Sequence, residues 1–324
     1  MSPRPIIAVT RRLPDAGMNM LAAASDIEAR VFQEDRPPTR SELLELLDGA
    51  TAAVTFVTDP IDGDVLDANP ALRVLANFAV GYDNIDVPAA TKRGVIVTNT
   101  PGVLTETTAD FTFALLISAA RRVVEASEYV RAGKWKTWSP TLLLGQDLHG
   151  ATIGIVGYGR IGREVGKRAA GFDMKVLVNN RSPLAIGDRA TAVDLDILLA
   201  ESDFVCLNVA LTPETRGMIG KRELALMKPS AILINAARGP VVQTDALYEA
   251  LSTGVIAGAA LDVTDPEPLP ADHPLIGLDN CLIAPHIASA TVATRARMAT
   301  MAVANALAVA RGEHPLNPVN DVSS

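Results

Sequence analysis

Three side chains in this sequence have the chemical types needed to bind and protonate a carbonyl compound while it is reduced. Arg238 and His286 each come shortly after an apolar run, and Glu267 lies between two prolines that restrict the local backbone. An arginine binds a carboxylate through two parallel hydrogen bonds and polarises an adjacent carbonyl, whereas a histidine can deliver a proton near neutral pH. A carboxylate that is hydrogen-bonded to an imidazole orients the ring and favours its protonated form. We therefore expect Arg238, Glu267 and His286 to form a catalytic set.

Structural roles stay open as alternatives. Glu267 could be a solvated turn acid, and His286 could be a satisfied structural histidine. The two cysteines, Cys206 and Cys281, lie in apolar runs without metal-ligand spacing, so we expect buried reduced thiols and no metal site. The other histidines lie in a polar turn, a proline-rich loop and the C-terminal tail, where structural roles are expected (His149, His273, His314).

A glycine motif follows the apolar run 152–156 and leads into a helical pattern over 160–170. Gly157 permits a tight turn, Gly159 lets the backbone approach phosphates, and Gly162 lets the helix pack on the strand. The start of the helix directs its unpaired N–H groups at an anion. Glycine triplets also occur in ordinary turns, but this one stands between a strand and a helix. We therefore expect it to bind the pyrophosphate of a dinucleotide.

The cofactor type is indicated by Asn180, Arg181 and Ser182. They lie where an NAD enzyme carries, roughly 20 residues past the glycine motif, an acid for the ribose 2′-hydroxyl. A neutral asparagine does not repel a 2′-phosphate, an arginine can bind it in a bidentate way, and a serine can donate another hydrogen bond. We therefore expect NADPH to be preferred over NADH. In the alternative, Arg181 faces solvent and both cofactors bind.

The elements that must position these residues alternate between short strands and helices, which is typical of parallel α/β sheets. In the N-terminal part we expect strands at 6–9, 52–56, 74–77 and 95–98 and helices at 13–24, 62–68 and 87–93. A long helix is expected at 105–132, and a final helix at 291–311 with Gly312 as its C-cap. Between these helices we expect strands at 152–156, 175–178, 204–207, 231–234, 256–261 and 281–283.

Composition and charge bound the class of protein. A chain of 324 residues suggests two domains, and 48% hydrophobic with 4% aromatic residues predicts a core of alanine, valine, leucine and isoleucine. The net charge of −8 argues against nucleic acid or a membrane surface as a partner. The N-terminus lacks the apolar core of a signal peptide, and no apolar run is long enough to span a bilayer. We therefore expect a cytoplasmic enzyme.

The glycine motif followed by Arg238, Glu267 and His286 resembles the arrangement in the D-isomer-specific 2-hydroxyacid dehydrogenases. The resemblance covers nearly the whole chain, with further motifs at 79–86, 99–103, 211–215 and 261–268. Within this family the chain is most similar to the glyoxylate/hydroxypyruvate reductases, on motifs at 133–138, 267–275 and 286–291. Ala288 departs from the pattern, because many relatives carry glycine there.

The resemblance implies two doubly wound parallel-sheet domains with the active site in the cleft. A Rossmann NAD(P)-binding domain, residues 105–287, would be inserted into a flavodoxin-like substrate domain, residues 1–104 and 288–324. The resemblance also implies a set of residues that bind substrate: the backbone N–H groups of Val80 and Gly81, together with Arg238, His286 and Ser289.

The resemblance further implies a set of cofactor-binding positions, in which Asp262 faces the nicotinamide end. In the structural interpretation Asp262 is a strand-end cap, and Gly81 is a turn residue. The full set is Thr108, Gly157, Gly159, Arg160, Ile161, Gly162, Asn180, Arg181, Ser182, Ala210, Thr215, Ala236, Arg238, Asp262, His286 and Ala288.

Two tryptophans follow the expected long helix. Trp135 and Trp138 would by default pack in a core or at a dimer interface. The resemblance implies a homodimer formed through residues 105–140, in which Trp138 reaches into the substrate pocket of the partner subunit. It would then contribute to substrate selectivity.

The activity implied by the resemblance is the NADPH-dependent reduction of glyoxylate or hydroxypyruvate to the D-2-hydroxy acid. Reduction of 2-ketogluconate or another 2-oxo acid is the alternative within the family. The same fold and residues also resemble nucleotide-sensing transcriptional corepressors, so a binding protein is the alternative of a different class. We rank a phosphoglycerate dehydrogenase lower, because no regulatory domain follows residue 324, and we rank a formate dehydrogenase lowest.

Overall fold

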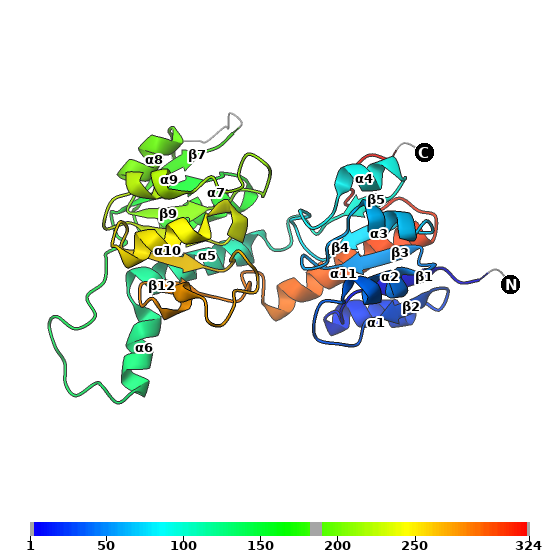
Figure 1. The fold of residues 1–324 in the computed structure, drawn as a ribbon, viewed down its shortest axis with the longest axis horizontal. Helices are drawn as coiled ribbons and strands as arrows, with labels where there is room; N and C mark the ends of the chain where they lie inside the picture. Colours follow the sequence, from blue (N-terminus) through cyan, green and yellow to red (C-terminus); the bar gives the residue numbers. More distant parts are fainter. Residues whose placement is uncertain (1–2, 182–189, 323–324) are drawn as a thin grey trace. The chain divides into compact units, whose positions relative to one another are not determined.

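The chain forms two compact units, each built on a parallel β-sheet (Figure 1). The computed structural model describes residues 3–181 and 190–322. Unit 1 comprises Met1–Leu104 and Ala290–Ser324, and unit 2 comprises Thr105–Ser289. The second division thus falls after residue 289, compared with the expected division after residue 287. The predicted fold class, two parallel-sheet α/β domains, is confirmed.

Unit 1 has a five-stranded sheet with the order β2-β1-β3-β4-β5, which is the flavodoxin-like order. Every residue of β3 and β4 is buried, as expected for central strands with both faces covered. The strands are β1 Ile6–Val9, β2 Glu28–Val31, β3 Ala52–Thr55, β4 Val74–Asn77 and β5 Ile96–Thr98. The helices are α1 Asp15–Ala23, α2 Arg40–Leu47, α3 Gly63–Ala68, α4 Val87–Lys92 and the returning α11 Val292–Ala310.

Unit 2 has a seven-stranded sheet with the order β12-β11-β10-β9-β6-β7-β8, and all its pairings are parallel. Six of its strands follow the Rossmann order, in which ligands bind beyond the carboxyl ends of the strands. The strands are β6 Thr152–Val156, β7 Lys175–Asn179, β8 Thr191–Ala192, β9 Phe204–Leu207, β10 Ile232–Asn235, β11 Gly258–Leu261 and β12 Cys281–Ile283. The helices are α5 Thr105–Ala120, α6 Val123–Arg131, α7 Arg160–Ala170, α8 Leu195–Glu201, α9 Lys221–Leu226 and α10 Thr244–Ser252.

The prediction of a single helix at 105–132 is wrong, because the chain forms two helices, α5 and α6, in this region. Arg122 has a φ of 52°, in the left-handed region, and this ends the regular helix. The last carbonyl of α5, on Ala120, accepts a hydrogen bond from the N–H of Gln146 over 2.8 Å. A side chain on Gly145 would overlap that carbonyl oxygen, so the returning loop needs glycine there.

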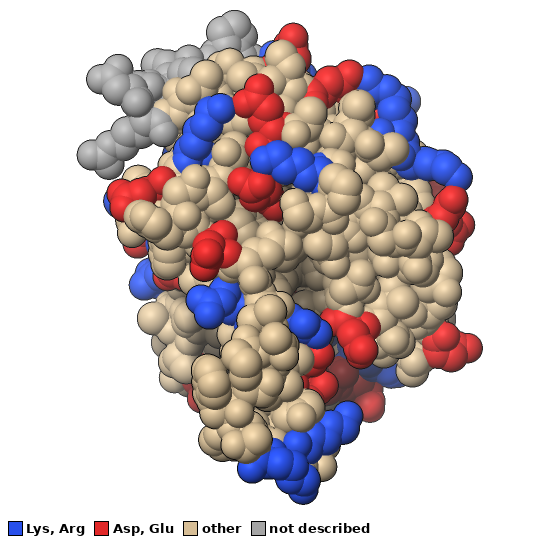
Figure 2. All heavy atoms as spheres, turned by 90° about the vertical axis from the view of Figure 1, so that its left-hand side faces the viewer, with Lys and Arg blue, Asp and Glu red and all other residues tan. Residues whose placement is uncertain are grey.

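Helix α6 and the loop after it project from the body of unit 2 (Figure 1). None of the α6 residues is buried, and the exposed apolar side chains of this region are Val123, Val124, Val130, Trp135, Trp138 and Leu144. Figure 2 views the molecule from the side on which this segment lies and shows broad uncharged areas there, with basic side chains gathered at the lower end. Within residues 3–181 and 190–322, no helix combines the length and the apolar character needed to cross a bilayer.

Candidate active site

His286 lies in the loop after β12 with a φ of 55°, and Asp262 at the end of β11 holds this loop. The N–H of His286 donates to the backbone carbonyl of Asp262 over 2.8 Å. The N–H groups of Ile287 and Ala288 donate to the Asp262 carboxylate over 2.7 and 2.8 Å. A left-handed backbone at a non-glycine residue costs on the order of 1–3 kcal/mol, so it requires such support. Three consecutive hydrogen bonds to one residue thus fix the backbone of His286.

The same carboxylate is almost fully removed from solvent. Asp262 is 1% exposed, and burial raises its pKa above the ordinary value. The N–H groups of Ile287 and Ala288 act in the opposite direction but do not cancel the effect of burial. Asp262 is therefore the strand-end cap of the structural interpretation. Its contact with a nicotinamide stays a prediction.

The His286 ring is paired with Glu267 from the loop after β11. Nδ1 of His286 lies 2.6 Å from Oε1 of Glu267, and the two side chains are 30% and 33% exposed. Burial alone would raise the pKa of Glu267, but the hydrogen bond and charge of His286, with smaller effects of Thr264 and Arg238, lower it below the ordinary value. Glu267 is therefore a carboxylate at neutral pH. Because both side chains are partly exposed, a small molecule can reach a proton that this pair holds.

Arg238 lies in the loop after β10, which Asn235 shapes from the end of that strand. The Asn235 side chain accepts a hydrogen bond from the N–H of Ala237 over 3.0 Å and donates to the carbonyl of Arg238 over 2.9 Å. A side chain on Gly239 would overlap the carbonyl oxygen of Thr264, so only glycine lets the two loops meet. The structure thus brings the Arg238 loop against the loop that carries Glu267, at the carboxyl ends of adjacent strands.

The glycine motif has the geometry that a pyrophosphate requires. Gly157 has a φ of 92°, and a Cβ there would lie 2.7 Å from the backbone of Asn208. A side chain on Gly162 would overlap the carbonyl oxygen of Gly157, whereas one on Gly159 would meet nothing within 4 Å. Gly159 is also the N-cap of α7 and supplies no side-chain cap to the helix N–H groups. These residues therefore fit a dinucleotide whose phosphates lie at the start of α7.

The residues expected to select the cofactor follow β7. The Asn180 side-chain oxygen accepts a hydrogen bond from the N–H of Tyr158, which ties the end of β7 to the glycine motif over 3.2 Å. Arg181 lies close enough to Glu214, in the loop after β9, for its charge to contribute to the lowered pKa of that acid, after the Thr212 hydrogen bond and a backbone hydrogen bond. Ser182, the third expected residue, lies outside the described residues.

The other expected cofactor positions lie in unit 2. Thr215 and Ala210 belong to the loop after β9 and are joined by a hydrogen bond from the threonine hydroxyl to the alanine carbonyl over 2.7 Å. Thr108 is buried in α5. The remaining positions are Arg160 and Ile161 at the start of α7, Ala236 after β10 and Ala288 after β12.

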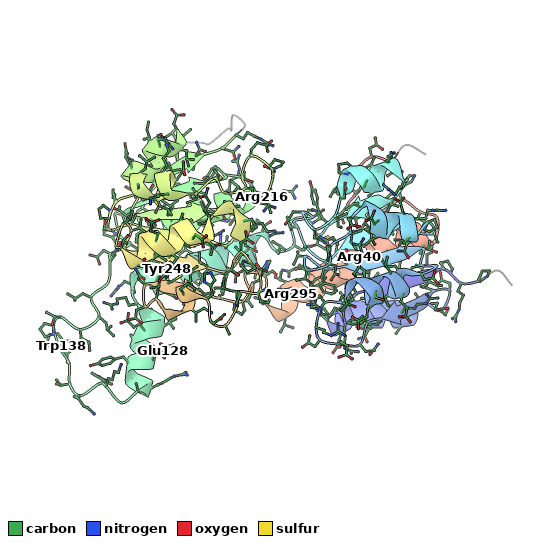
Figure 3. The ribbon with its side chains drawn as sticks, viewed as in Figure 1. Arg40, Glu128, Trp138, Arg216, Tyr248 and Arg295 are labelled. Atoms are coloured by element: carbon green, nitrogen blue, oxygen red, sulfur yellow. The ribbon has the colours of Figure 1, made fainter. Side chains whose placement is uncertain are left out.

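The expected substrate residues fall in both units. Val80 and Gly81 follow β4 in unit 1, whereas Ser289 follows Ala288 at the end of unit 2. Trp138 lies in the projecting loop after α6 (Figure 3), and it is 78% exposed. The loop-shaping role of Asn235 was not predicted, although a polar residue at the end of an apolar strand is a signal that could have indicated it. For Asp262, a strand-end cap was the structural interpretation.

Comparisons with known proteins show the family of this chain. Residues 113–288 match the family model described as the D-isomer specific 2-hydroxyacid dehydrogenase, NAD binding domain. The chain is 51% identical over 321 residues to a glyoxylate reductase of Korarchaeum cryptofilum, covering 98% of this chain and 96% of that protein.

Two solved structures have the same fold as this chain over nearly its whole length. A protein of Thermus thermophilus superposes with a TM-score of 0.92 at 48% identity, covering 97% of this chain and 100% of the other. An NADPH-dependent glyoxylate/hydroxypyruvate reductase of Sinorhizobium meliloti, solved with NADP and malonate, gives a TM-score of 0.84 at 31% identity, covering 98% and 97%. The chain therefore belongs to the D-isomer specific 2-hydroxyacid dehydrogenases, a family of oxidoreductases.

Proposed function

We propose that this protein reduces glyoxylate to glycolate and hydroxypyruvate to the D-2-hydroxy acid with NADPH. The observation that carries the proposal is the 2.6 Å contact between His286 and Glu267. These residues lie in the loops after β12 and β11, and Arg238 lies in the loop after the next strand of the sheet, β10. The glyoxylate reductase from K. cryptofilum, at 51% identity, supports the substrate class. The bound NADP in the S. meliloti reductase supports the cofactor.

Each residue of the set has a distinct task in this proposal. Arg238 binds the substrate carboxylate with a bidentate pair of hydrogen bonds, and the N–H groups of Val80 and Gly81 add further donors. The second ring nitrogen of His286 gives its proton to the carbonyl oxygen, while Glu267 on Nδ1 fixes the ring and stabilises its charged form. When bound, the nicotinamide cofactor supplies the hydride to the carbonyl carbon.

The preference for NADPH rests on the residues after β7. Asn180 is neutral and engaged with the N–H of Tyr158, and Arg181 supplies a positive charge beside the expected ribose position. An Arg181→Ala variant should raise the KM for NADPH while leaving that for NADH nearly unchanged. Equal catalytic efficiency of the wild type with the two cofactors would contradict the preference.

The projecting segment, α6 with the loop to Leu144, is proposed as the surface on which a second copy of the chain packs. Its apolar side chains are largely exposed in the single chain, from Val124 at 43% to Trp138 at 78%. Several large apolar side chains exposed in one segment are typical of protein interfaces. Sedimentation analysis should give a dimer for the wild type and a larger monomer fraction for a Val124→Glu, Val130→Glu double variant.

Turnover with purified protein tests the activity directly. Loss of nicotinamide absorbance is measured with glyoxylate, hydroxypyruvate and 2-ketogluconate as substrates. The proposal expects the first two acids to have the higher kcat/KM. If cofactor binds and none of the three acids is reduced, a nucleotide-sensing binding protein becomes the better account.

A further inference from the structure

Two asparagines at the ends of neighbouring strands hold the loop that carries Val80 and Gly81. Asn77 is the last residue of β4, and Asn99 follows β5 directly. Their side-chain amides donate to the carbonyl oxygens of Gly81 and Val80, respectively, each over 2.8 Å. We propose that Asn99 is a positioning residue that aims the Gly81 N–H at the substrate carboxylate, and that Asn77 supports it by holding the next peptide of the same loop. The inference rests on the proposed function, in which those N–H groups bind a 2-oxo acid.

Each of these hydrogen bonds fixes an N–H group as well as a carbonyl. The C=O and N–H of a trans peptide lie in one plane and point in opposite directions. Asn99, by holding the carbonyl of Val80, therefore sets the direction of the Gly81 N–H. The carbonyl of Ala79 accepts from the backbone N–H of Thr100 over 2.8 Å, which sets the direction of the Val80 N–H. Both N–H groups consequently point away from the β5 end that holds their peptides.

The two N–H groups are available to a ligand. No hydrogen bond among residues 3–181 and 190–322 uses the N–H of Val80 or Gly81, and both residues are partly exposed. Consecutive backbone N–H groups held in this way are a common anion-binding arrangement. Because the loop is already ordered, binding a carboxylate does not require it to lose conformational freedom.

The orientation of Asn77 is itself fixed by its neighbours. Asn77 is 0% exposed, and its side-chain oxygen accepts from the hydroxyl of Thr55 on β3 over 3.1 Å. Its amide nitrogen is therefore directed at the loop, where it also reaches the side-chain oxygen of Asn84 over 3.2 Å. Asn84 in turn donates to the carbonyl of Phe56 over 2.9 Å. The network ties the loops after β3 and β4 together, which restricts the conformation of the loop that carries Val80 and Gly81.

This arrangement makes a specific prediction about selectivity. Main-chain N–H groups contact the carboxylate, which every 2-oxo acid shares, and not the group that distinguishes one acid from another. Loss of the Asn99 side chain should therefore raise the KM for glyoxylate and hydroxypyruvate by the same factor. A residue that shapes the pocket around the variable group would change the two KM values unequally.

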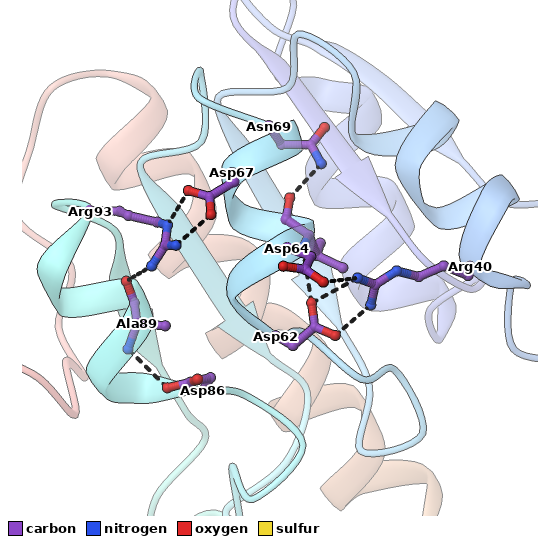
Figure 4. Close-up of polar contacts among 9 residues, drawn as sticks. Arg40, Asp62, Asp64, Asp67, Asn69, Asp86, Ala89 and Arg93 are labelled. Atoms are coloured by element: carbon purple, nitrogen blue, oxygen red, sulfur yellow. Dashed lines mark hydrogen bonds and ion pairs between the residues drawn. The ribbon is translucent and has the colours of Figure 1, made fainter.

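The matched control is Asn69, a buried asparagine in the same unit. It is 3% exposed, and its side-chain amide donates to the carbonyl of Val65 over 2.8 Å at the end of α3. Figure 4 shows Asn69 beside the ion pairs of Arg40 with Asp62 and of Arg93 with Asp67, which tie α3 to its neighbours. An Asn69→Leu variant thus loses the same kind of hydrogen bond without touching the Val80 and Gly81 loop.

The experiment compares Asn99→Leu and Asn99→Asp with Asn69→Leu in the full-length protein. The readouts are the KM for both acids, the inhibition constant of oxamate as an unreactive carboxylate, the Kd of NADPH, and the Tm. We expect both Asn99 variants to raise the KM values and the oxamate constant about tenfold, equivalent to ~1.4 kcal/mol, with the NADPH Kd unchanged. Asn99→Asp keeps the side-chain size, so it separates the loss of the donor from a packing defect. KM values equal to those of Asn69→Leu would overturn the proposal.

A binding measurement separates this inference from the activity. In protein labelled with ¹⁵N-glycine, the Gly81 amide resonance is assigned with a Gly81→Ala variant, and oxamate is added to saturation. The resonance should shift in the wild type and in Asn69→Leu but not in Asn99→Leu. A shift without any turnover would reject the proposed function alone. No shift in an active wild type would reject the positioning role alone.

Discussion

Nδ1 of His286 lies 2.6 Å from Oε1 of Glu267, while the backbone N–H of the same histidine is held by Asp262 over 2.8 Å. Glu267 therefore holds the imidazole ring of His286, and Asp262 holds the backbone of the same residue. The pKa values of the two acids shift in opposite directions, because burial raises the pKa of Asp262 whereas the contacts with His286 lower the pKa of Glu267 against the effect of burial. Only Glu267 has the exposure to act in proton transfer.

Replacing Glu267 by glutamine should change the pH dependence more than substrate affinity. The glutamine keeps the size of the side chain but cannot stabilise the charged imidazole of His286, so the alkaline limb of the kcat profile should move to lower pH. The measurement is kcat against pH with saturating glyoxylate and NADPH. An unchanged profile would show that Glu267 is a solvated turn acid.

The pair of Glu267 and His286 should make the free energy of unfolding depend on pH in the acid range. The pKa of Glu267 is lowered on folding, so its contribution to the free energy of unfolding is present above the ordinary glutamate pKa and is lost as pH falls through the lowered value. Urea unfolding midpoints of the wild type and Glu267→Gln should therefore differ at pH 7 and converge as the pH approaches 3. A difference that stays constant over this range would contradict the assignment.

Asp262→Asn should lower both stability and turnover. The asparagine presents an N–H donor where the N–H groups of Ile287 and Ala288 require acceptors, so at least one charge-assisted hydrogen bond is lost. The expected loss of stability is about 1.5–3 kcal/mol, measured by urea unfolding. Asp265→Asn, an exposed residue in the same loop, is the control. Equal stability of the two variants would contradict the capping role.

Gly239→Ala should impair the site through its backbone. The added methyl group would overlap the carbonyl oxygen of Thr264, so the Arg238 loop must separate from the loop of Glu267. We expect kcat/KM for glyoxylate to fall strongly. Gly277→Ala is the matched control, because a Cβ at Gly277 meets nothing within 4 Å and its φ is not in the left-handed region. Similar kinetics for the two alanine variants would show that the loops are not in close contact.

The two cysteines should be unreactive in the folded protein. Burial raises the pKa of Cys281 to about 12 and raises that of the fully buried Cys206 further, so very little thiolate exists at pH 8. Titration with a thiol reagent should give almost no fast reaction in the native state and two thiols in denaturant. One rapidly reacting thiol in the native protein would contradict this.

Much of the fold could be predicted from the sequence because hydrophobic runs of the right length mark buried parallel strands. The strand at 152–156 and the helix at 160–170 match β6 and α7. The edge strand β2, Glu28–Val31, was missed, since a charged edge strand lacks an apolar run. Helix α2 was also missed, although Thr39 and Glu42 form a capping box that signals its start.

The candidate site was only partly predictable for a related reason. The positions of Arg238 and His286 after two parallel strands could be predicted, because apolar runs mark those strands and ligands bind beyond their carboxyl ends. The hydrogen bonds of Asp262 to the His286 loop depend on the pairing of β11 with β12 and on a left-handed φ at His286, and no sequence pattern specifies them. The same holds for Asn77 and Asn99, whose partners become evident only when β4 and β5 are adjacent.

The central claim is that His286 supplies the proton when this protein reduces a 2-oxo acid. The most direct measurement is single-turnover loss of NADPH absorbance with glyoxylate for the wild type and His286→Ala, with NADPH binding measured separately. We expect the rate of the variant to fall by roughly 10²–10⁴-fold while its NADPH Kd changes little. A near-normal rate for His286→Ala would contradict the account.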